Sequence, residues 1–181
     1  MLKKIIFTTL LSASLYAQAD NNISYNYFEV GYDYRNSNTS HGPYLNGSFN
    51  LNESFYLGGY YDRDSKSYID LDQYGLFLGF HNSISDRTDF YTEFSAGRVD
   101  NNRFSSAAYG LDIGTRTAFA ENFELITNLG YTHFDDSNSD GFLGGGVKGL
   151  FKFNKSNSIT VGLENLDHGF LRTSIGYRYS F

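Results

Sequence analysis

The stretch that decides the fold is the last one in the chain, LRTSIGYRYSF, residues 171–181. Apolar or aromatic side chains occupy alternate positions at Ile175, Tyr177, Tyr179 and Phe181, and glycine, arginine or serine fills the positions between them. Successive side chains of a β-strand point to opposite faces of the sheet. This order therefore predicts a strand with one apolar face and one polar face.

The same period of two recurs through the rest of the chain. It is found in residues 28–35, 45–51, 73–80, 111–116 and 159–164. In the first of these segments, large apolar side chains alternate with Glu29, Gly31 and Asp33. A helical period of 3.6 residues fits none of the segments, so the pattern predicts an all-β fold.

Two kinds of connector alternate between these segments. Short polar turns framed by aromatic residues lie near residues 52–54, 82–88, 121–122 and 154–157. Loops rich in asparagine, serine, aspartate and glycine lie near residues 36–42, 63–67, 99–104, 135–141 and 165–169. Nine connectors join ten antiparallel strands, which would use about 100 residues at ~10 residues for each membrane-crossing strand. The alternative is an eight-stranded barrel, in which one turn and one loop within residues 81–104 merge.

The amino terminus predicts export. Two lysines at positions 3 and 4 precede a short apolar stretch, residues 5–16, and Ala17-Gln18-Ala19 is typical of a signal-peptide cleavage site. The apolar run is well short of the ~20 residues that a spanning helix needs. We therefore expect a cleaved signal peptide, residues 1–19, followed by a single barrel domain, residues 20–181.

The polar face of the strands indicates which side meets lipid. A soluble lipocalin-like barrel with an apolar lumen would show the same alternation. Here, however, the polar face holds glycine, serine, asparagine and scattered charges, and only four lysines follow residue 19. Aromatic residues gather at strand ends beside the turns, as they do at a bilayer interface. The apolar face is therefore expected to meet lipid, and a sheet in a bilayer has to close into an up-and-down barrel.

Composition excludes several other classes of protein. The 181 residues carry 14 Lys and Arg against 20 Asp and Glu, a net charge of −6, which disfavours a nucleic-acid partner. The chain has no cysteine, so disulfide frameworks and thiolate metal sites are excluded. No motif indicates a cofactor.

The terminal strand resembles the carboxy-terminal strand of Gram-negative outer-membrane β-barrel proteins, in particular the small barrels of the OmpA-like and OmpX-like superfamily. The resemblance implies an outer-membrane location, with lipid and lipopolysaccharide as surroundings. It also implies that Ile175, Tyr177, Tyr179 and Phe181 form the signal read by the barrel-assembly machinery. A weaker resemblance, through residues 71–76 and 85–89, is to small barrels once proposed as a quorum factor. The predicted outer loops are shorter than in the OmpX pattern, which disfavours adhesion, and we expect a monomer.

The polar face supplies the candidate functional residues. Thirteen charged residues are predicted to line the lumen: Glu29, Asp33, Arg35, Asp72, Glu93, Asp112, Arg116, Glu124, Lys148, Lys152, Glu164, Arg172 and Arg178. Their charges nearly balance, which leaves two interpretations. Either they pair across strands and fill a closed barrel with a structural role in the envelope, or they line a narrow passive pore for ions or small solutes.

Catalysis and metal binding are not expected. Asp167 and His168, in a predicted outer loop, could form an acid and base pair of an outer-membrane hydrolase, but they lie in a turn that ends in glycine, where aspartate is an ordinary turn former. The four histidines have no ligand spacing. Six aspartates are assigned to a solvated outer-loop face rather than to a cation site: Asp62, Asp64, Asp100, Asp135, Asp136 and Asp140.

Overall fold

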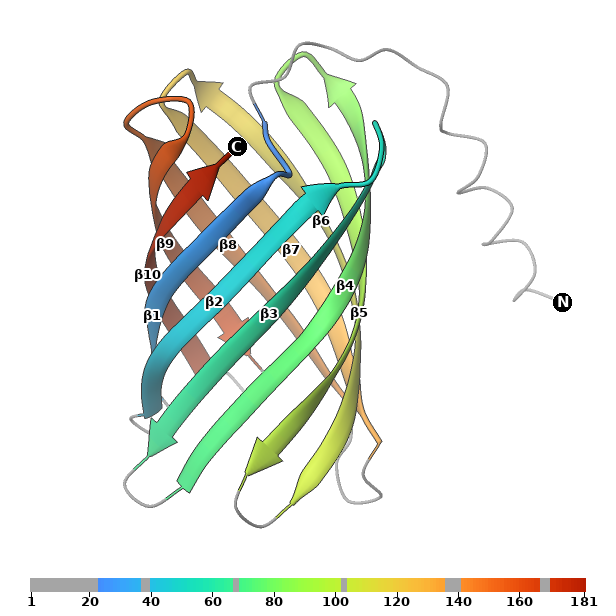
Figure 1. Cartoon of the computed structure of the whole chain (residues 1–181), viewed down its shortest axis with the longest axis vertical. Coiled ribbons are helices and arrows are strands. Elements are labelled where there is room, and N and C mark those ends of the chain that lie inside the picture. The colour runs from blue at the N-terminus through green and yellow to red at the C-terminus, as the bar shows by residue number, and fades with distance from the viewer. Residues whose placement is uncertain (1–22, 37–39, 67–68, 102–103, 136–140, 167–169) are drawn as a thin grey trace, which may run out of the picture.

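The computed structural model describes residues 23–36, 40–66, 69–101, 104–135, 141–166 and 170–181. These residues form one closed antiparallel barrel of ten strands (Figure 1). The strands are β1 (Tyr27–Arg35), β2 (Ser40–Asn50), β3 (Phe55–Lys66), β4 (Ile69–Ser85), β5 (Thr88–Asn101), β6 (Ser105–Ala120), β7 (Phe123–Phe134), β8 (Phe142–Lys152), β9 (Asn157–Leu166) and β10 (Phe170–Ser180). The ten-stranded prediction is confirmed and the eight-stranded alternative is wrong, because β4 continues to Ser85 and pairs with a separate long strand, β5, from Thr88 to Asn101. The predicted signal peptide, residues 1–19, lies outside the described residues.

The carboxy-terminal strand closes the barrel. β10 pairs with β9 on one side and with β1 on the other, in a register that runs from Tyr27 opposite Ser180 to Arg35 opposite Arg172. Each remaining strand pairs with its neighbours in sequence. Closure leaves no open sheet edge, so the strands satisfy their backbone groups among themselves, as lipid requires.

Both described ends of the chain lie at the end of the barrel that carries the short turns, here called the turn side (Figure 1). In two of these turns, an asparagine side chain accepts hydrogen bonds from backbone N–H groups two and three residues later. The side-chain oxygen of Asn52 accepts hydrogen bonds from the backbone N–H groups of Ser54 and Phe55, each at 2.9 Å. Asn154 accepts in the same way from Ser156 and Asn157. This arrangement is a known means of closing a tight turn. The opposite end, where β1 connects to β2, β3 to β4, β5 to β6, β7 to β8 and β9 to β10, is called the loop side.

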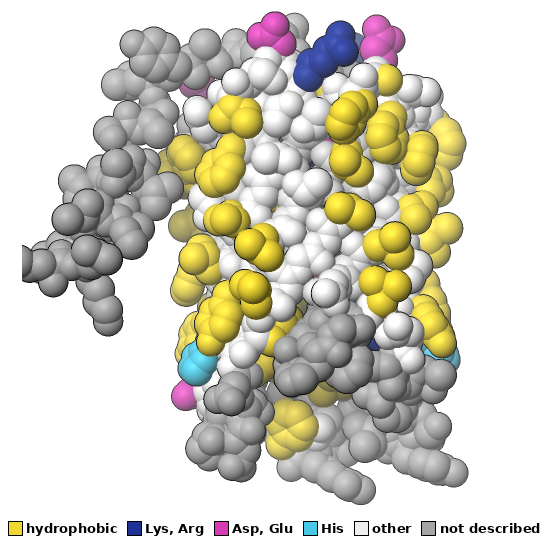
Figure 2. Space-filling model, turned by 180° about the vertical axis from the view of Figure 1, so that it is seen from behind, with side chains coloured by type: hydrophobic (Ala, Val, Ile, Leu, Met, Phe, Trp, Pro, Cys, Tyr) yellow, Lys and Arg dark blue, Asp and Glu magenta, His cyan; other side chains and the backbone are white. Residues whose placement is uncertain are grey.

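The outer face of the barrel is apolar. Figure 2 shows hydrophobic side chains spread over the wall between the ends, with Lys, Arg, Asp and Glu side chains at the turn side. Outward-facing residues such as Leu76, Leu111 and Ile175 are more than half exposed. Aromatic pairs ring the turn side, with Phe55 against Phe80 and Phe123 against Phe151 at 5.3 and 5.0 Å between ring centroids. An apolar band bordered by aromatic residues is the surface of a transmembrane barrel, so the prediction that this face meets lipid agrees with the structure.

No helix among the described residues is long and apolar enough to cross a membrane.

Candidate functional site: the barrel lumen

The lumen contains a cavity of about 600 Å³ that is lined by residues from all ten strands. The lining extends from Tyr27 and Arg116 near the turn side to Arg35 and Phe142 near the loop side. Five glycines on the inward faces of four strands, β6 to β9, widen this space, because they place no side chain in it. Those that line it are Gly110, Gly130, Gly144, Gly146 and Gly162. Polar and charged side chains fill much of the remaining wall.

One buried carboxylate, that of Glu29, binds side chains from four other strands inside the lumen. Glu29 is completely buried, and its Oε1 accepts hydrogen bonds from the Tyr44 hydroxyl at 2.8 Å and from Lys148 Nζ at 3.0 Å. The Thr160 hydroxyl donates to the same oxygen at 3.2 Å. The Arg178 guanidinium binds the other oxygen, Oε2, with Nε at 2.7 Å and Nη2 at 2.6 Å. Glu29 therefore connects β1 to β2, β8, β9 and β10.

A second ionic group lies nearer the turn side. Arg116 binds Glu124 through Nε at 2.7 Å and Nη2 at 2.6 Å, and Lys152 Nζ lies 3.0 Å from the other oxygen of Glu124. Arg116 Nη1 also donates to the backbone carbonyl of Ser24 at 3.0 Å. The buried carboxylate is thus neutralised from two strands, β6 and β8, as a buried charge requires.

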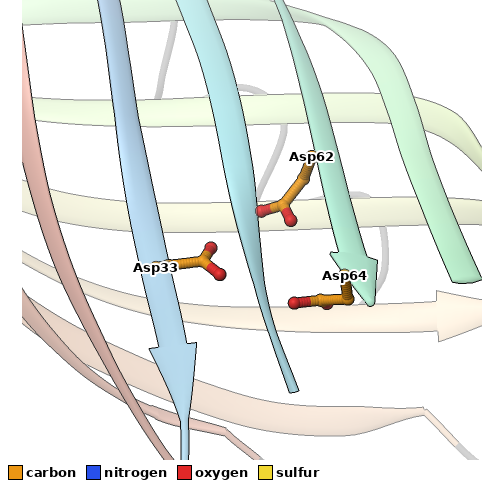
Figure 3. Close-up of side chains that lie close together, drawn as sticks. All are labelled: Asp33, Asp62 and Asp64. Atoms are coloured by element: carbon orange, nitrogen blue, oxygen red, sulfur yellow. The ribbon is translucent and has the colours of Figure 1, made fainter. Parts of the chain in front are cut away.

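The third group lies at the loop side and corrects the sequence-based assignment. The sequence assigns Asp62 and Asp64 to a solvated loop face, but both are buried in β3, and their carboxylates lie close to that of Asp33 in β1, with β2 between the two strands (Figure 3). One oxygen from each of the three carboxylates lies within 4.8 Å of the other two. Arg35 Nη1 lies 2.7 Å from Asp64, and Arg172 contacts both Asp33 and Asp62. Two guanidinium groups therefore offset most of the carboxylate charge.

The wall formed by β5 and β6 differs from the opposite wall. Glu93 and Asp112 are directly opposite each other in the register of these strands, and both line the cavity. Glu93 accepts a hydrogen bond from the Tyr56 hydroxyl at 2.8 Å, and Asp112 accepts one from the Asn128 amide at 3.2 Å. These donors are neutral.

The residues just before β1 fold into the turn-side mouth, which the strand periodicity did not predict. Tyr25 is 3% exposed, and its ring stacks on His81 with centroids 4.0 Å apart. The guanidinium carbon of Arg116 lies 4.4 Å from the centroid of the Tyr25 ring, a distance typical of a cation–π contact. The Ser48 hydroxyl donates to the Tyr25 carbonyl. Residues 23–26 therefore narrow this mouth.

Twelve of the thirteen predicted lumen residues lie on inward-facing positions, and Asp72 does not. Asp72 alternates with Leu71 and Gln73, which line the cavity, so its side chain is on the outer face. There it accepts a hydrogen bond from the Tyr61 hydroxyl at 2.6 Å and lies opposite Arg63 in β3. The reason is that β4 extends beyond the apolar belt at the loop side, where a charge on the outer face meets water.

Other predicted residues are placed as follows. Ile175, Tyr177, Tyr179 and Phe181 are exposed on the outer face of the terminal strand. Asp100 also points outward at the loop side, where its carboxylate accepts a hydrogen bond from the Tyr74 hydroxyl, and Asp135 is exposed just after β7. Asp136, Asp140, Asp167 and His168 lie outside the described residues, so the hydrolase pair has no described geometry.

The inward residues that the sequence reading missed include Asp62, Asp64 and Asp89. Asp89 is buried at the turn side of β5, where it accepts a hydrogen bond from the Ser83 hydroxyl at 2.8 Å. Extending the inward phase of β5 from Glu93 by two steps of two residues would have found Asp89.

No protein-family model and no curated protein sequence matches this chain. Solved structures do match its fold. The NanC porin matches with a TM-score of 0.64 and 7% sequence identity, over 85% of this chain and 100% of the porin. The KdgM porin matches with a TM-score of 0.55 and 15% identity, over 86% of this chain and 99% of the porin. An outer-membrane channel from Pseudomonas putida F1 matches with a TM-score of 0.57 and 11% identity, over 86% and 94% of the two chains. The chain has the fold of outer-membrane β-barrels, which confirms the resemblance drawn from its terminal strand.

Proposed function

We propose that this protein is a narrow passive pore of the outer membrane that admits ions and the smallest polar solutes. The observation that carries the proposal is the cavity of about 600 Å³, which all ten strands line and which reaches from turn-side to loop-side residues. Its wall carries charged and polar side chains and five glycines among its apolar residues, and charged groups of this kind hold water in a lumen. The protein does no chemistry on what passes and uses no cofactor.

The proposal includes the route to the membrane. Residues 1–19 direct export and are removed, and residues 20–181 remain in the outer membrane among lipid and lipopolysaccharide as a monomer. The barrel-assembly machinery reads the terminal strand. Its alternate residues, from Ile175 to Phe181, are exposed on the outer face and free of lumen contacts, which supports a role in recognition during assembly.

The turn-side mouth, which residues 23–26 narrow, is a constriction of the proposed pathway. Replacing Tyr25 with alanine removes the ring that stacks on His81 and lies against Arg116. We expect the variant to admit solutes roughly twofold faster than the wild type, since flux through a pore rises with the width of its constriction. The measurement is the swelling rate of proteoliposomes in a series of uncharged solutes of rising size.

The matched control for this experiment is Tyr109→Ala, which removes a tyrosine ring from the outer face of β6. The control is expected to swell at the wild-type rate. Equal rates for all three proteins would contradict a constriction at Tyr25.

A second candidate function, a closed barrel with a structural role in the envelope, is favoured by a different observation. The Arg116, Glu124 and Lys152 group and Tyr25 are all buried or nearly buried near the turn-side mouth, where they narrow the lumen. If these side chains seal the lumen, wild-type proteoliposomes will not swell in any solute and Tyr25→Ala will open them.

A further inference from the structure

The charges that face the lumen do not balance. Inward-facing positions of the described strands hold nine carboxylates: Glu29, Asp33, Asp62, Asp64, Asp89, Glu93, Asp112, Glu124 and Glu164. They hold six basic side chains: Arg35, Arg116, Lys148, Lys152, Arg172 and Arg178. With histidine neutral, the described lumen therefore carries an excess of three negative charges.

Each of the six basic groups already has a carboxylate partner. Lys148 and Arg178 bind Glu29, and Arg116 and Lys152 bind Glu124. At the loop side, the guanidinium groups of β1 and β10 bind Asp33, Asp62 and Asp64. A passing anion would have to compete with these fixed carboxylates for every cation in the wall.

Two carboxylates in the same wall have no such partner. Among the described residues, neither Glu93 nor Asp112 forms an ion pair, and their printed donors are the neutral groups of Tyr56 and Asn128. The two carboxylates are directly opposite on adjacent strands, and like charges in that position repel each other. A mobile cation beside them in the cavity would relieve that repulsion.

We propose that the pore prefers small cations to anions and that Glu93 and Asp112 determine this preference. The inference rests on the proposed function, because it names the class of ion that the same lumen conducts. The uncompensated carboxylates raise the local concentration of cations and lower that of anions, as acidic residues do in other cation-conducting pores. The basic side chains add little to the potential of the pathway because their own carboxylates neutralise them.

The test is the reversal potential of the full-length protein in a planar bilayer across a gradient of potassium chloride. Wild-type protein is expected to show a reversal potential of the sign that marks potassium permeation. The double variant E93Q/D112N keeps the size of both side chains and removes both charges. Its ratio of potassium to chloride permeability is expected to fall roughly threefold or more, since each kT of potential changes the local ion concentration by about that factor.

The matched control is E53Q/E121Q, which removes two carboxylates from exposed turns outside the cavity. The control is expected to keep the wild-type permeability ratio. Heat-modifiable migration verifies that each variant is folded. If the double variant does not fold, the single variants E93Q and D112N are measured instead, and each is expected to lower the permeability ratio by a smaller factor.

The outcomes separate the two proposals. Current without a preference for potassium, or a preference that E93Q/D112N leaves unchanged, would overturn the inference and leave the pore intact. Absence of current from the wild type and all variants would overturn the proposed function, and the cation preference with it.

Discussion

Replacing Glu29 with glutamine is expected to lower the free energy of unfolding of the barrel by about 3–5 kcal/mol. The variant keeps the shape of the side chain but removes the charge that Lys148 and Arg178 share. Both cations would then lie inside the barrel without their carboxylate, and removing one partner of a buried ion pair leaves the other uncompensated. The amide of glutamine would also direct a donor toward groups that themselves donate, such as the guanidinium of Arg178.

The measurement is a urea titration of the protein folded in lipid vesicles, with the folded fraction read from heat-modifiable migration. The control Glu53→Gln makes the same chemical change in the exposed turn between β2 and β3. It is expected to change the free energy of unfolding by no more than about 0.5 kcal/mol. A loss below about 1 kcal/mol for Glu29→Gln would show that lumen water solvates the two cations and that the ionic core is not a stabilising feature.

Replacing Leu76 with arginine is expected to destabilise the folded barrel by about 2–4 kcal/mol. Leu76 lies near the middle of β4 on the outer face and is 64% exposed, so in the membrane its side chain contacts the hydrocarbon core. An arginine there would place a charge in lipid or force water into the bilayer. The same urea titration measures the loss.

The control is Ile84→Arg on the same strand. Ile84 is 62% exposed and lies at the turn side, so it is equally accessible but near the membrane surface. Its replacement is expected to cost about 0–1 kcal/mol, because the cost of a charge falls toward the interface. Equal losses at the two positions would contradict a lipid-facing outer wall.

Much of the fold could be predicted because the two faces of each strand meet different surroundings. Lipid favours apolar side chains on the outer face, and the lumen accommodates polar side chains on the inner face, so the two kinds alternate along the strand. The stretch 171–181 shows this order plainly, and the structure places it where its pattern requires, as the strand that closes the barrel. The alternation of turns framed by aromatic residues with loops rich in asparagine, serine, aspartate and glycine predicts ten strands for the same reason, since each hairpin crosses the membrane twice.

The pattern was less informative where both faces carry similar residues. In β3, Tyr60 and Tyr61 are adjacent, and only Tyr60 belongs to the inward phase that continues to Asp62 and Asp64. Two neighbouring tyrosines obscure that phase in the sequence, so the pattern by itself assigns the two aspartates to a loop. The error at Asp72 had the opposite origin, because a charge beyond the membrane belt can lie on the outer face.

The aromatic group in the turn-side mouth could not be read from any local pattern. Tyr25 precedes the first strand, and its partners His81 and Arg116 come from β4 and β6. Contacts between residues so far apart in the sequence depend on the closed barrel. The pairing of Glu29 with Arg178, 149 residues away, depends on it in the same way.

The proposed pore predicts that purified, folded wild-type protein carries current across a planar bilayer. A water-filled lumen through ten strands predicts small, discrete current steps that appear only after the protein inserts. They should persist across several concentrations of potassium chloride. A folded, inserted protein that carries no current at any salt concentration would contradict the pore and leave the closed, structural barrel as the account of this chain.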